Sequence, residues 1–288
     1  MNEIRHLSTV YLYFLKHLKD VRLSYRKFFK MQNAYKSKDA LRSLLNEAYE
    51  KHVISKPEIF CNTGVSIELQ RKSKNQLKLL KECKEDPETT YAIALCGYWS
   101  FLRVRKGASD LRFVDRTIPT YPSNIAPREL TFTEKGTLIE DPYPHGWDEI
   151  DWEVYYLLKK PSRSYTDALR ESKKNGLGIS RDTLKKRFKK IMNVCKVHMN
   201  FFPRGYRAYD EIFFTFKTEY ELGLYDALKK LDRTSFLWKT KDFLILNIFV
   251  ERYNASVKHF KEMEENGLIY DLKISIPIRN YSPFLEGF

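Results

Sequence analysis

The sequence predicts an α+β protein made of two copies of a winged helix-turn-helix, each followed by a βαββαβ ferredoxin-like domain. Three observations predict it: an internal repeat of long period, helical spacing of apolar residues early in each half, and mixed strand and helix patterns later. We expect five segments, which are 1–63 (first helix-turn-helix), 64–133 (partly degenerate ferredoxin-like domain), 134–146 (linker), 147–208 (second helix-turn-helix) and 209–288 (second ferredoxin-like domain).

The repeat has an offset of 143 residues and aligns 37–45 with 180–188. After small shifts, 89–104 also matches 234–249. Loop insertions produce shifts of this size, so we interpret the chain as a tandem duplication whose halves meet near residue 145.

The stretch between Ile118 and Trp147 is rich in proline, which blocks helix continuation and fixes extended or turn backbone, and it predicts a boundary between the halves around 140–146. The prolines concerned are Pro119, Pro122, Pro127, Pro142 and Pro144.

Helical spacing is clearest in the second half. The predicted helices cover 148–159, 164–175 and 181–193. In the third, Leu184, Phe188 and Ile191 recur at i, i+4 and i+7, and Ser180 is placed to cap its first turn.

Strands and helices then follow in a mixed order. Two strands, over 194–202 and 206–216, are expected to form the wing around a turn at 203–205. The βαββαβ pattern follows as 211–217, 220–230, 234–238, 243–250, 256–265 and 268–278. The first half repeats this pattern from 65 to about 132, with 108–115 as a shorter helix.

Four stretches carry a family resemblance. They are Asp148-Glu149-Ile150-Asp151, Ser164-Tyr165, Ile179-Ser180-x-x-Thr183-Leu184-x-x-Arg187-Phe188-x-x-Ile191 and Cys96-Gly97-Tyr98-Trp99-Ser100-Phe101-Leu102. Together they resemble the leucine-responsive/asparagine (Lrp/AsnC) regulators of bacteria and archaea, which join a winged helix-turn-helix to a βαββαβ effector-type domain. The sequence departs from the family at Cys195, where a glycine is usual, and at Ser100, where an aspartate is expected.

Basic charge is concentrated where the helix-turn-helix units are predicted. The chain carries 51 Lys and Arg against 37 Asp and Glu, a net charge of +14. Residues 159–207 contribute +12 and residues 16–51 contribute +6. A strongly basic protein usually has a polyanionic partner, so we expect double-stranded DNA and a role in transcription regulation.

The resemblance places the third helix of each helix-turn-helix in the DNA major groove. The residues expected to contact base edges are Arg181, Thr183, Lys186 and Arg187. For Arg187, support of the fold or of a backbone contact is an equal alternative. The residues expected at phosphates are Ser164, Tyr165, Lys185, Lys189, Lys190, Arg204 and Arg207, with Lys38 and Arg42 in the first copy.

The two copies are not equivalent, because Ala40 and Leu44 replace the second copy's Thr183 and Arg187. We therefore expect an internal pseudo-dimer with one strong and one weak DNA-binding helix. A small-molecule effector and a homodimer remain open alternatives. The residues expected in an effector pocket are Gly97, Trp99, Ser100 and Asp242. The aromatic residues Tyr98, Trp99, Phe236 and Trp238 are expected on strands, in core or interface packing.

Other chemistries have no motif. The six histidines show no HxxxH or HxH spacing, and GxxxxGK[ST], GxGxxG and GxSxG are absent, so we expect no metal, no cofactor and no enzyme. The four cysteines include no CxxC pair and are expected to be reduced thiols. No apolar run approaches the ~18 residues of a membrane span, so we expect a cytoplasmic, nucleoid-associated protein.

Two alternatives remain open. The first is a ligand-sensing or enzymatic module that keeps this fold without DNA binding; siroheme decarboxylases share the family architecture, although no histidine cluster is visible for such chemistry. The second is a plasmid or viral replication initiator, because these also use tandem winged helices.

Overall fold

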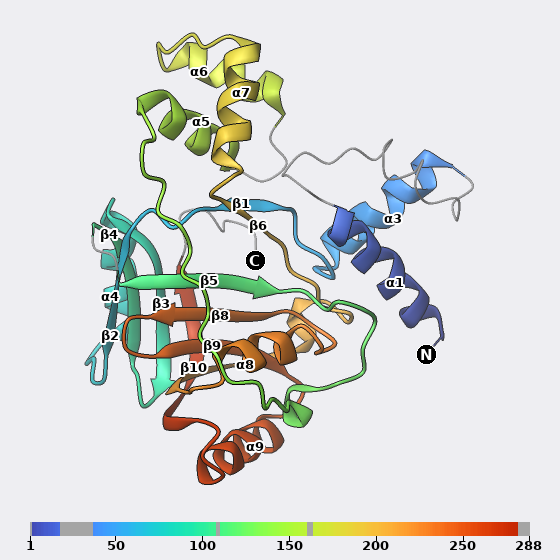
Figure 1. Ribbon diagram of the computed structural model, residues 1–288, viewed down its shortest axis with the longest axis vertical. Coiled ribbons are helices and arrows are strands. Elements are labelled where there is room, and N and C mark those ends of the chain that lie inside the picture. The colour runs from blue at the N-terminus through green and yellow to red at the C-terminus, as the bar shows by residue number, and fades with distance from the viewer. Residues whose placement is uncertain (1, 18–36, 108–109, 160–163, 282–288) are drawn as a thin grey trace. The chain divides into compact units, whose positions relative to one another are not determined.

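The computed structural model describes residues 2–17, 37–107, 110–159 and 164–281, and its elements are a mixture of helices and antiparallel strands (Figure 1). The chain divides into two compact units. The first is formed by Met1–Cys61, Thr120–Pro122 and Pro142–Arg207, and the second by Asn62–Pro119, Ser123–Asp141 and Ala208–Phe288. Each unit therefore contains segments from both halves of the sequence.

Three helices of the second half pack together in the first unit (Figure 1), and the sequence predicted all three. They are α5 (Glu149–Lys159), α6 (Tyr165–Lys174) and α7 (Arg181–Ile191). Leu184, Phe188 and Ile191 are buried on α7, as their spacing predicted. Ser180 caps α7 as predicted, because its hydroxyl accepts a hydrogen bond from the Thr183 amide at 3.1 Å.

The first half supplies α1 (Asn2–His17) and α3 (Lys38–Glu50) to the same unit. Ser37 caps α3 in the same way, accepting from the Ala40 amide at 3.1 Å. Residues 18–36, which belong to the first predicted helix-turn-helix (1–63), lie outside the described residues.

The expected wing hairpin is wrong. Strand β6 (Lys196–His198) pairs with β1 (Glu58–Phe60) of the first half, in antiparallel register. After β6 the chain continues beside the first half, where the Phe202 amide donates to the Val53 carbonyl at 2.7 Å. Gly205, at φ +80°, sits so close to the Lys51 carbonyl that a Cβ would lie 2.5 Å from its oxygen. A partner strand from the other half thus satisfies the backbone groups that a hairpin would have used.

The second unit contains one antiparallel sheet of eight strands (Figure 1). Its strands are β2 (Val65–Gln70), β3 (Thr89–Gly97), β4 (Phe101–Lys106), β5 (Leu111–Thr117), β7 (Asp210–Lys217), β8 (Ser235–Thr240), β9 (Leu244–Val250) and β10 (Tyr270–Tyr281). Their order is β2-β4-β3-β10-β7-β9-β8-β5. Strands of the two halves meet where β3 pairs with β10 and where β5 pairs with β8.

The helix expected over 108–115 is wrong from residue 111 onward, where the chain forms β5. Phe113 and Val114 in this stretch are buried, and both are residue types that favour strands. The pairing partner decides the outcome, because β8 offers an open edge and Val114 lies opposite Trp238. Strand β8 belongs to the other half of the sequence, so the spacing of residues within 108–115 could not predict this pairing.

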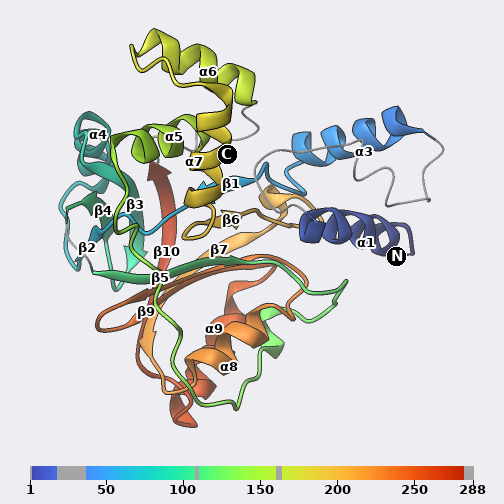
Figure 2. The same cartoon turned by 45° about the horizontal axis from the view of Figure 1, so that its top comes forward.

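Helices α8 (Glu221–Leu228) and α9 (Tyr253–Glu265) cover one face of the second half's strands (Figure 2). Phe260 of α9 is fully buried there and stacks on Phe214 of β7 with ring centroids 4.2 Å apart. Helix α4 (Gln76–Glu85) packs Leu80 and Cys83 on β3 and β4. A short 3-10 helix, Pro127–Glu129, lies in the proline-rich segment, and another, Tyr206–Ala208, precedes β7.

The sheet is strongly curved. Tyr91 of β3 and Trp238 of β8 are four strands apart in the sheet order, yet their ring centroids lie 5.6 Å apart. The two edges also meet, because the Asp110 amide, just before β5, donates to the Val65 carbonyl of β2 at 3.0 Å. None of the described helices has the length and apolarity needed to cross a membrane.

We predict that Phe260→Ala lowers the free energy of unfolding by about 3–5 kcal/mol, since it removes a fully buried ring and leaves a cavity. Urea denaturation measures this change. Leu77→Ala on α4 is the matched control, because Leu77 is 50% exposed and its loss should cost no more than about 0.5 kcal/mol. Equal effects of the two substitutions would contradict this account of the core.

Candidate functional site

Some basic side chains of α7 face solvent, and others contact residues at the start of α5. Arg181, Lys185, Lys186 and Lys189 are exposed. Thr183 is partly buried, and its hydroxyl lies 2.9 Å from that of Ser180 at the helix cap. The next two basic side chains, Arg187 and Lys190, turn toward α5.

Asp151 at the start of α5 holds both of these cations. Its carboxylate is fully buried and accepts hydrogen bonds from Arg187, at 3.1 Å, and from Lys190. Arg187 also donates to Asp148 at 2.7 Å. The Asp151 amide donates to Asp148 and, with Arg187, lowers the pKa of that carboxyl. Arg187 is therefore paired with two carboxylates of α5 and the residue before it in the folded chain.

The remaining expected DNA contacts are spread along the first unit. Ser164 caps α6 by accepting from the Asp167 amide, and the Tyr165 ring packs edge-on against Phe188. Arg204 and Arg207 are exposed in the segment after β6, which forms no hairpin. Lys38 and Arg42, the phosphate contacts expected in the first half, both lie in α3.

Three of the four residues expected in an effector pocket lie close together in sequence at one turn, and the fourth lies in another turn. Gly97, Trp99 and Ser100 lie at the end of β3 and in the turn to β4. Asp242 is exposed in the turn between β8 and β9. Both turns lie at the same end of the sheet, but β10, β7 and β9 separate β3 from β8. The backbone amide of Asp242 donates to the Thr240 hydroxyl of its own turn at 3.2 Å, and no hydrogen bond or ion pair of the described residues joins Asp242 to the other three.

The β3–β4 turn is built tightly. The expectation that Tyr98 and Trp99 lie on a strand is wrong, since both lie in this turn. Gly97 has φ +141°, and a Cβ there would lie 2.6 Å from the Ile274 carbonyl oxygen. The Trp99 amide donates to the Ser275 hydroxyl at 2.9 Å, and the Trp99 indole donates to the Thr215 hydroxyl at 2.8 Å. The turn is therefore fixed on β10 and β7.

Two cations lie against the Tyr98 ring. The Arg71 guanidinium carbon is 4.3 Å from the ring centroid, and the Lys273 ammonium is 4.8 Å from it. The Trp99 ring lies edge-on to Tyr98 at 4.9 Å. We call Arg71, Tyr98, Trp99 and Lys273 the Tyr98 site. Analysis of the sequence did not predict Arg71 or Lys273 at this site. The sheet register places Lys273 beside Tyr98, and the spacing of residues along the chain does not reveal that register.

The Tyr98 site is electropositive. Asp271 hydrogen-bonds the Lys273 ammonium at 2.8 Å and raises the pKa of Lys273, so this side chain stays charged at neutral pH. Arg71, Lys72 and Lys74 are exposed in the loop after β2. Among the described residues, none of these three pairs with a carboxylate. The run Arg71-Lys72-Ser73-Lys74 was the signal available in the sequence.

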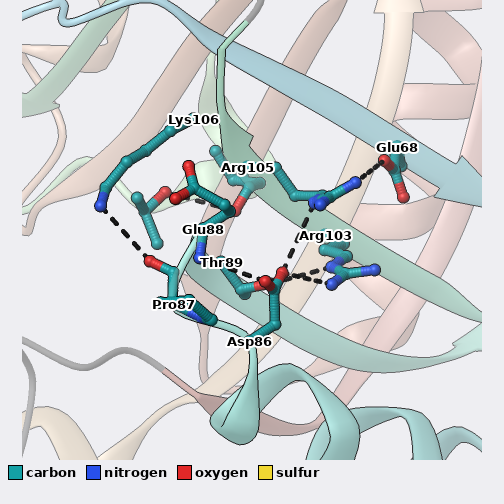
Figure 3. Close-up of polar contacts among 10 residues, drawn as sticks. Glu68, Asp86, Pro87, Glu88, Thr89, Arg103, Arg105 and Lys106 are labelled. Atoms are coloured by element: carbon teal, nitrogen blue, oxygen red, sulfur yellow. Dashed lines mark hydrogen bonds and ion pairs between the residues drawn. The ribbon is translucent and has the colours of Figure 1, made fainter.

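A polar network ties the turn after α4 to β4 (Figure 3). The Asp86 carboxylate accepts from the Thr89 hydroxyl at 2.7 Å and from the Arg103 guanidinium, and Arg105 lies 3.5 Å away. The Thr89 hydrogen bond is the largest cause that lowers the pKa of Asp86 to about 2, and Arg103 adds to it. A carboxylate engaged in this way stays ionised and has a structural role.

A pocket of about 170 Å³ lies between α1 and α3, below the ~300 Å³ at which ligand pockets usually begin. The described residues also contain no group of three or more His, Cys, Asp or Glu side chains that could hold a metal ion.

No protein-family model matches the sequence, and no curated protein is significantly similar to it. The chain is similar in fold to the siroheme decarboxylase NirDL. That crystal structure aligns with a TM-score of 0.53 and 9% sequence identity, over 93% of this chain and 91% of that chain. A second crystal structure, of NirDL in co-complex with an iron-uroporphyrin III analogue, aligns with the same values. At this identity the likeness shows the fold alone.

These neighbours correct the sequence-based identification. Membership of the Lrp/AsnC transcription regulators is wrong, because the matching structures are enzymes. The expectation of a non-enzyme is wrong for the same reason. The expectation of double-stranded DNA as partner, and with it of DNA binding and transcription regulation, is contradicted by the same neighbours, one of which was crystallised in co-complex with an iron-uroporphyrin III analogue. One fold can serve regulators and enzymes, and a basic surface attracts any polyanion.

We predict that Asp151→Ala lowers the free energy of unfolding by about 2 kcal/mol, because it removes charge-assisted hydrogen bonds that join α5 to α7. Thermal or urea unfolding followed by circular dichroism measures it. Asp182→Ala on α7 is the control, since that side chain is 95% exposed, and its effect should stay within about 0.5 kcal/mol. An unchanged stability in Asp151→Ala would show that the network does not hold the helices together.

We predict that the contribution of Asp86 to stability is lost in acid. Its pKa is about 2 in the folded chain against an ordinary value of 3.8, so its stabilising effect is complete above 3.8 and disappears as the pH falls through about 2. Unfolding curves for wild type and Asp86→Asn should therefore differ most near about pH 6 and converge toward pH 2. Glu85→Gln, at an exposed position of α4, is the control. A gap that stays constant with pH would contradict the assignment.

Proposed function

We propose that this chain is a small-molecule-binding module of enzymatic type, and that the Tyr98 site binds a planar ligand bearing carboxylates. One observation carries this: two cations from different elements, Arg71 and Lys273, meet at one aromatic ring beside a second, anchored aromatic ring.

The chemistry of the Tyr98 site suits such a ligand. A guanidinium presents a fork of donors that matches a carboxylate, and an ammonium adds a point charge. Flat rings of a ligand pack favourably on Tyr and Trp side chains. Because Thr215 and Ser275 already hold Trp99 in place, little conformational freedom is lost when a ligand binds.

The fold and the charge point to the same ligand class. One neighbour holds an iron-uroporphyrin III analogue, and uroporphyrins are flat macrocycles with carboxylate side chains. A net charge of +14 raises the local concentration of such anions and speeds their arrival. For this chain, the contacts we propose are to the ligand's ring and carboxylates.

We also propose that the chain is a tandem duplication with the five segments expected from sequence. The second half supports this through its strand order β10-β7-β9-β8, with α8 and α9 as the two connecting helices of a βαββαβ unit. The first half supports it through the order β2-β4-β3, the same arrangement without its fourth strand. Strand β5, which would complete that unit, pairs instead with β8 of the second half.

We predict that the full chain binds iron-uroporphyrin and that Arg71→Ala combined with Lys273→Ala weakens this binding by at least about tenfold. A charge-assisted hydrogen bond contributes about 1.5–3 kcal/mol, and 1.4 kcal/mol corresponds to a factor of ten. The shift of the porphyrin absorption band on titration measures the dissociation constant. Quenching of tryptophan fluorescence by the bound ligand is a second readout. The quenching that wild type shows and Trp99→Phe does not show comes from Trp99 and therefore reports on the Tyr98 site.

The control variant, Arg128→Ala with Lys241→Ala, removes the same charge from exposed positions of the second unit and should bind as wild type does. An iron porphyrin with neutral side chains should bind weakly to all forms. Absence of saturable binding by wild type, or equal weakening in both double variants, would overturn the proposal.

A further inference from the structure

The pairing of β1 with β6 sets two cysteines opposite each other. The register pairs Ile59 with Val197 and Phe60 with Lys196. One step further along both strands, the same register places Cys61 opposite Cys195. Side chains at opposite positions of an antiparallel pair have Cβ atoms about 4.5–5.5 Å apart, and a disulfide needs about 3.5–4.5 Å. Closing the bond would require a shift of about 1 Å.

Two further observations place the thiols near each other in the first unit. Cys61 is the largest cause that raises the pKa of Cys195, and the Cys61 thiol donates to the carbonyl of Val194, the residue before Cys195, at 3.9 Å. Both cysteines are unbonded to any other sulfur. Cys61 is 3% exposed, whereas Cys195 is only partly buried. Cys195 is therefore the thiol that a reagent in solvent reaches first, and Cys61 is the buried thiol of the pair.

The surroundings keep this pair in place. Cys61 and Cys195 belong to a hydrophobic cluster that also contains Ile59, Val154 and Ile191. Tyr155, which is 1% exposed, lies in the same cluster. The described residues place no third Cys, His, Asp or Glu with the pair in a metal-binding group. The arrangement is that of a dithiol and not of a metal centre.

We propose that Cys61 and Cys195 form a redox-active dithiol that closes to a disulfide across β1 and β6 and joins the two halves of the chain covalently. The oxidant is a small-molecule disulfide. The Cys195 thiolate attacks one of its sulfurs, its S–S bond breaks, and one thiol leaves. The Cys61 thiolate then attacks the Cys195 sulfur and expels the second thiol. The two cysteines lose two electrons and two protons, which convert the oxidant into two thiols.

The reaction should be slow at neutral pH. The neighbouring Cys61 thiol and burial both raise the pKa of Cys195, so little of Cys195 is thiolate at neutral pH. Below a raised pKa the thiolate fraction, and with it the rate of closure, grows about tenfold for each pH unit. Cys83 and Cys96 lie in the second unit, on α4 and β3, and serve as internal controls.

The test incubates the full chain with oxidised glutathione at several pH values and then alkylates the remaining thiols in denaturant. We expect Cys83 to be alkylated, glutathione to be retained on no cysteine other than the exposed Cys96, and a tryptic peptide pair to be linked through Cys61 and Cys195. The Cys83→Ser, Cys96→Ser double variant should close as wild type does. In Cys61→Ser the reaction should stop at the mixed disulfide between Cys195 and one glutathione.

Closure should also raise the unfolding temperature of wild type, and a reductant should reverse the rise. Wild type that keeps all four cysteines alkylatable at high pH, that retains glutathione on Cys195, or that links a different pair would overturn the proposal. These outcomes are read on wild type, so they do not depend on the folding of a variant.

Discussion

Backbone hydrogen bonds between strands of the two sequence halves are the constraint on which both compact units depend. In the first unit the pairing is β1 with β6, and in the second it is β3 with β10 and β5 with β8. Each of these strands would otherwise expose an edge of unpaired amides and carbonyls, which is costly when buried. Neither half completes these sheets by itself, so the halves must fold around each other.

The same pairing builds the places where chemistry is concentrated. The Tyr98 site combines a turn of the first half with Lys273 of β10, and Thr215 of β7 anchors it. The Cys61–Cys195 pair takes one thiol from each half. Because both halves belong to one chain, such pairs stay together at every protein concentration, whereas two separate chains would have to associate first.

The distribution of charge has two different physical roles. On α7, Arg187 and Lys190 neutralise the buried Asp151, so part of the basic face stabilises the helix cluster. Breaking such a network leaves charge that is partly removed from water, which makes it structural. Around Tyr98, Arg71 has no carboxylate partner among the described residues, and a cation in that state is available to a ligand. Charge counted along a sequence does not separate these roles, which explains why the expectation of DNA was wrong.

The sequence by itself determined the local elements. Apolar spacing and caps predicted α5, α6 and α7, and the strand and helix pattern of the second half predicted β7 to β10, because these signals act over a few residues. Tertiary structure decided which strands pair and which side chains from distant segments meet. The partner of β6, the strand at 111–117 and the approach of Lys273 to Tyr98 depend on residues more than a hundred positions away. Only the folded chain brings such residues together, since the choice among open strand edges is settled by the whole sheet and not by any one segment.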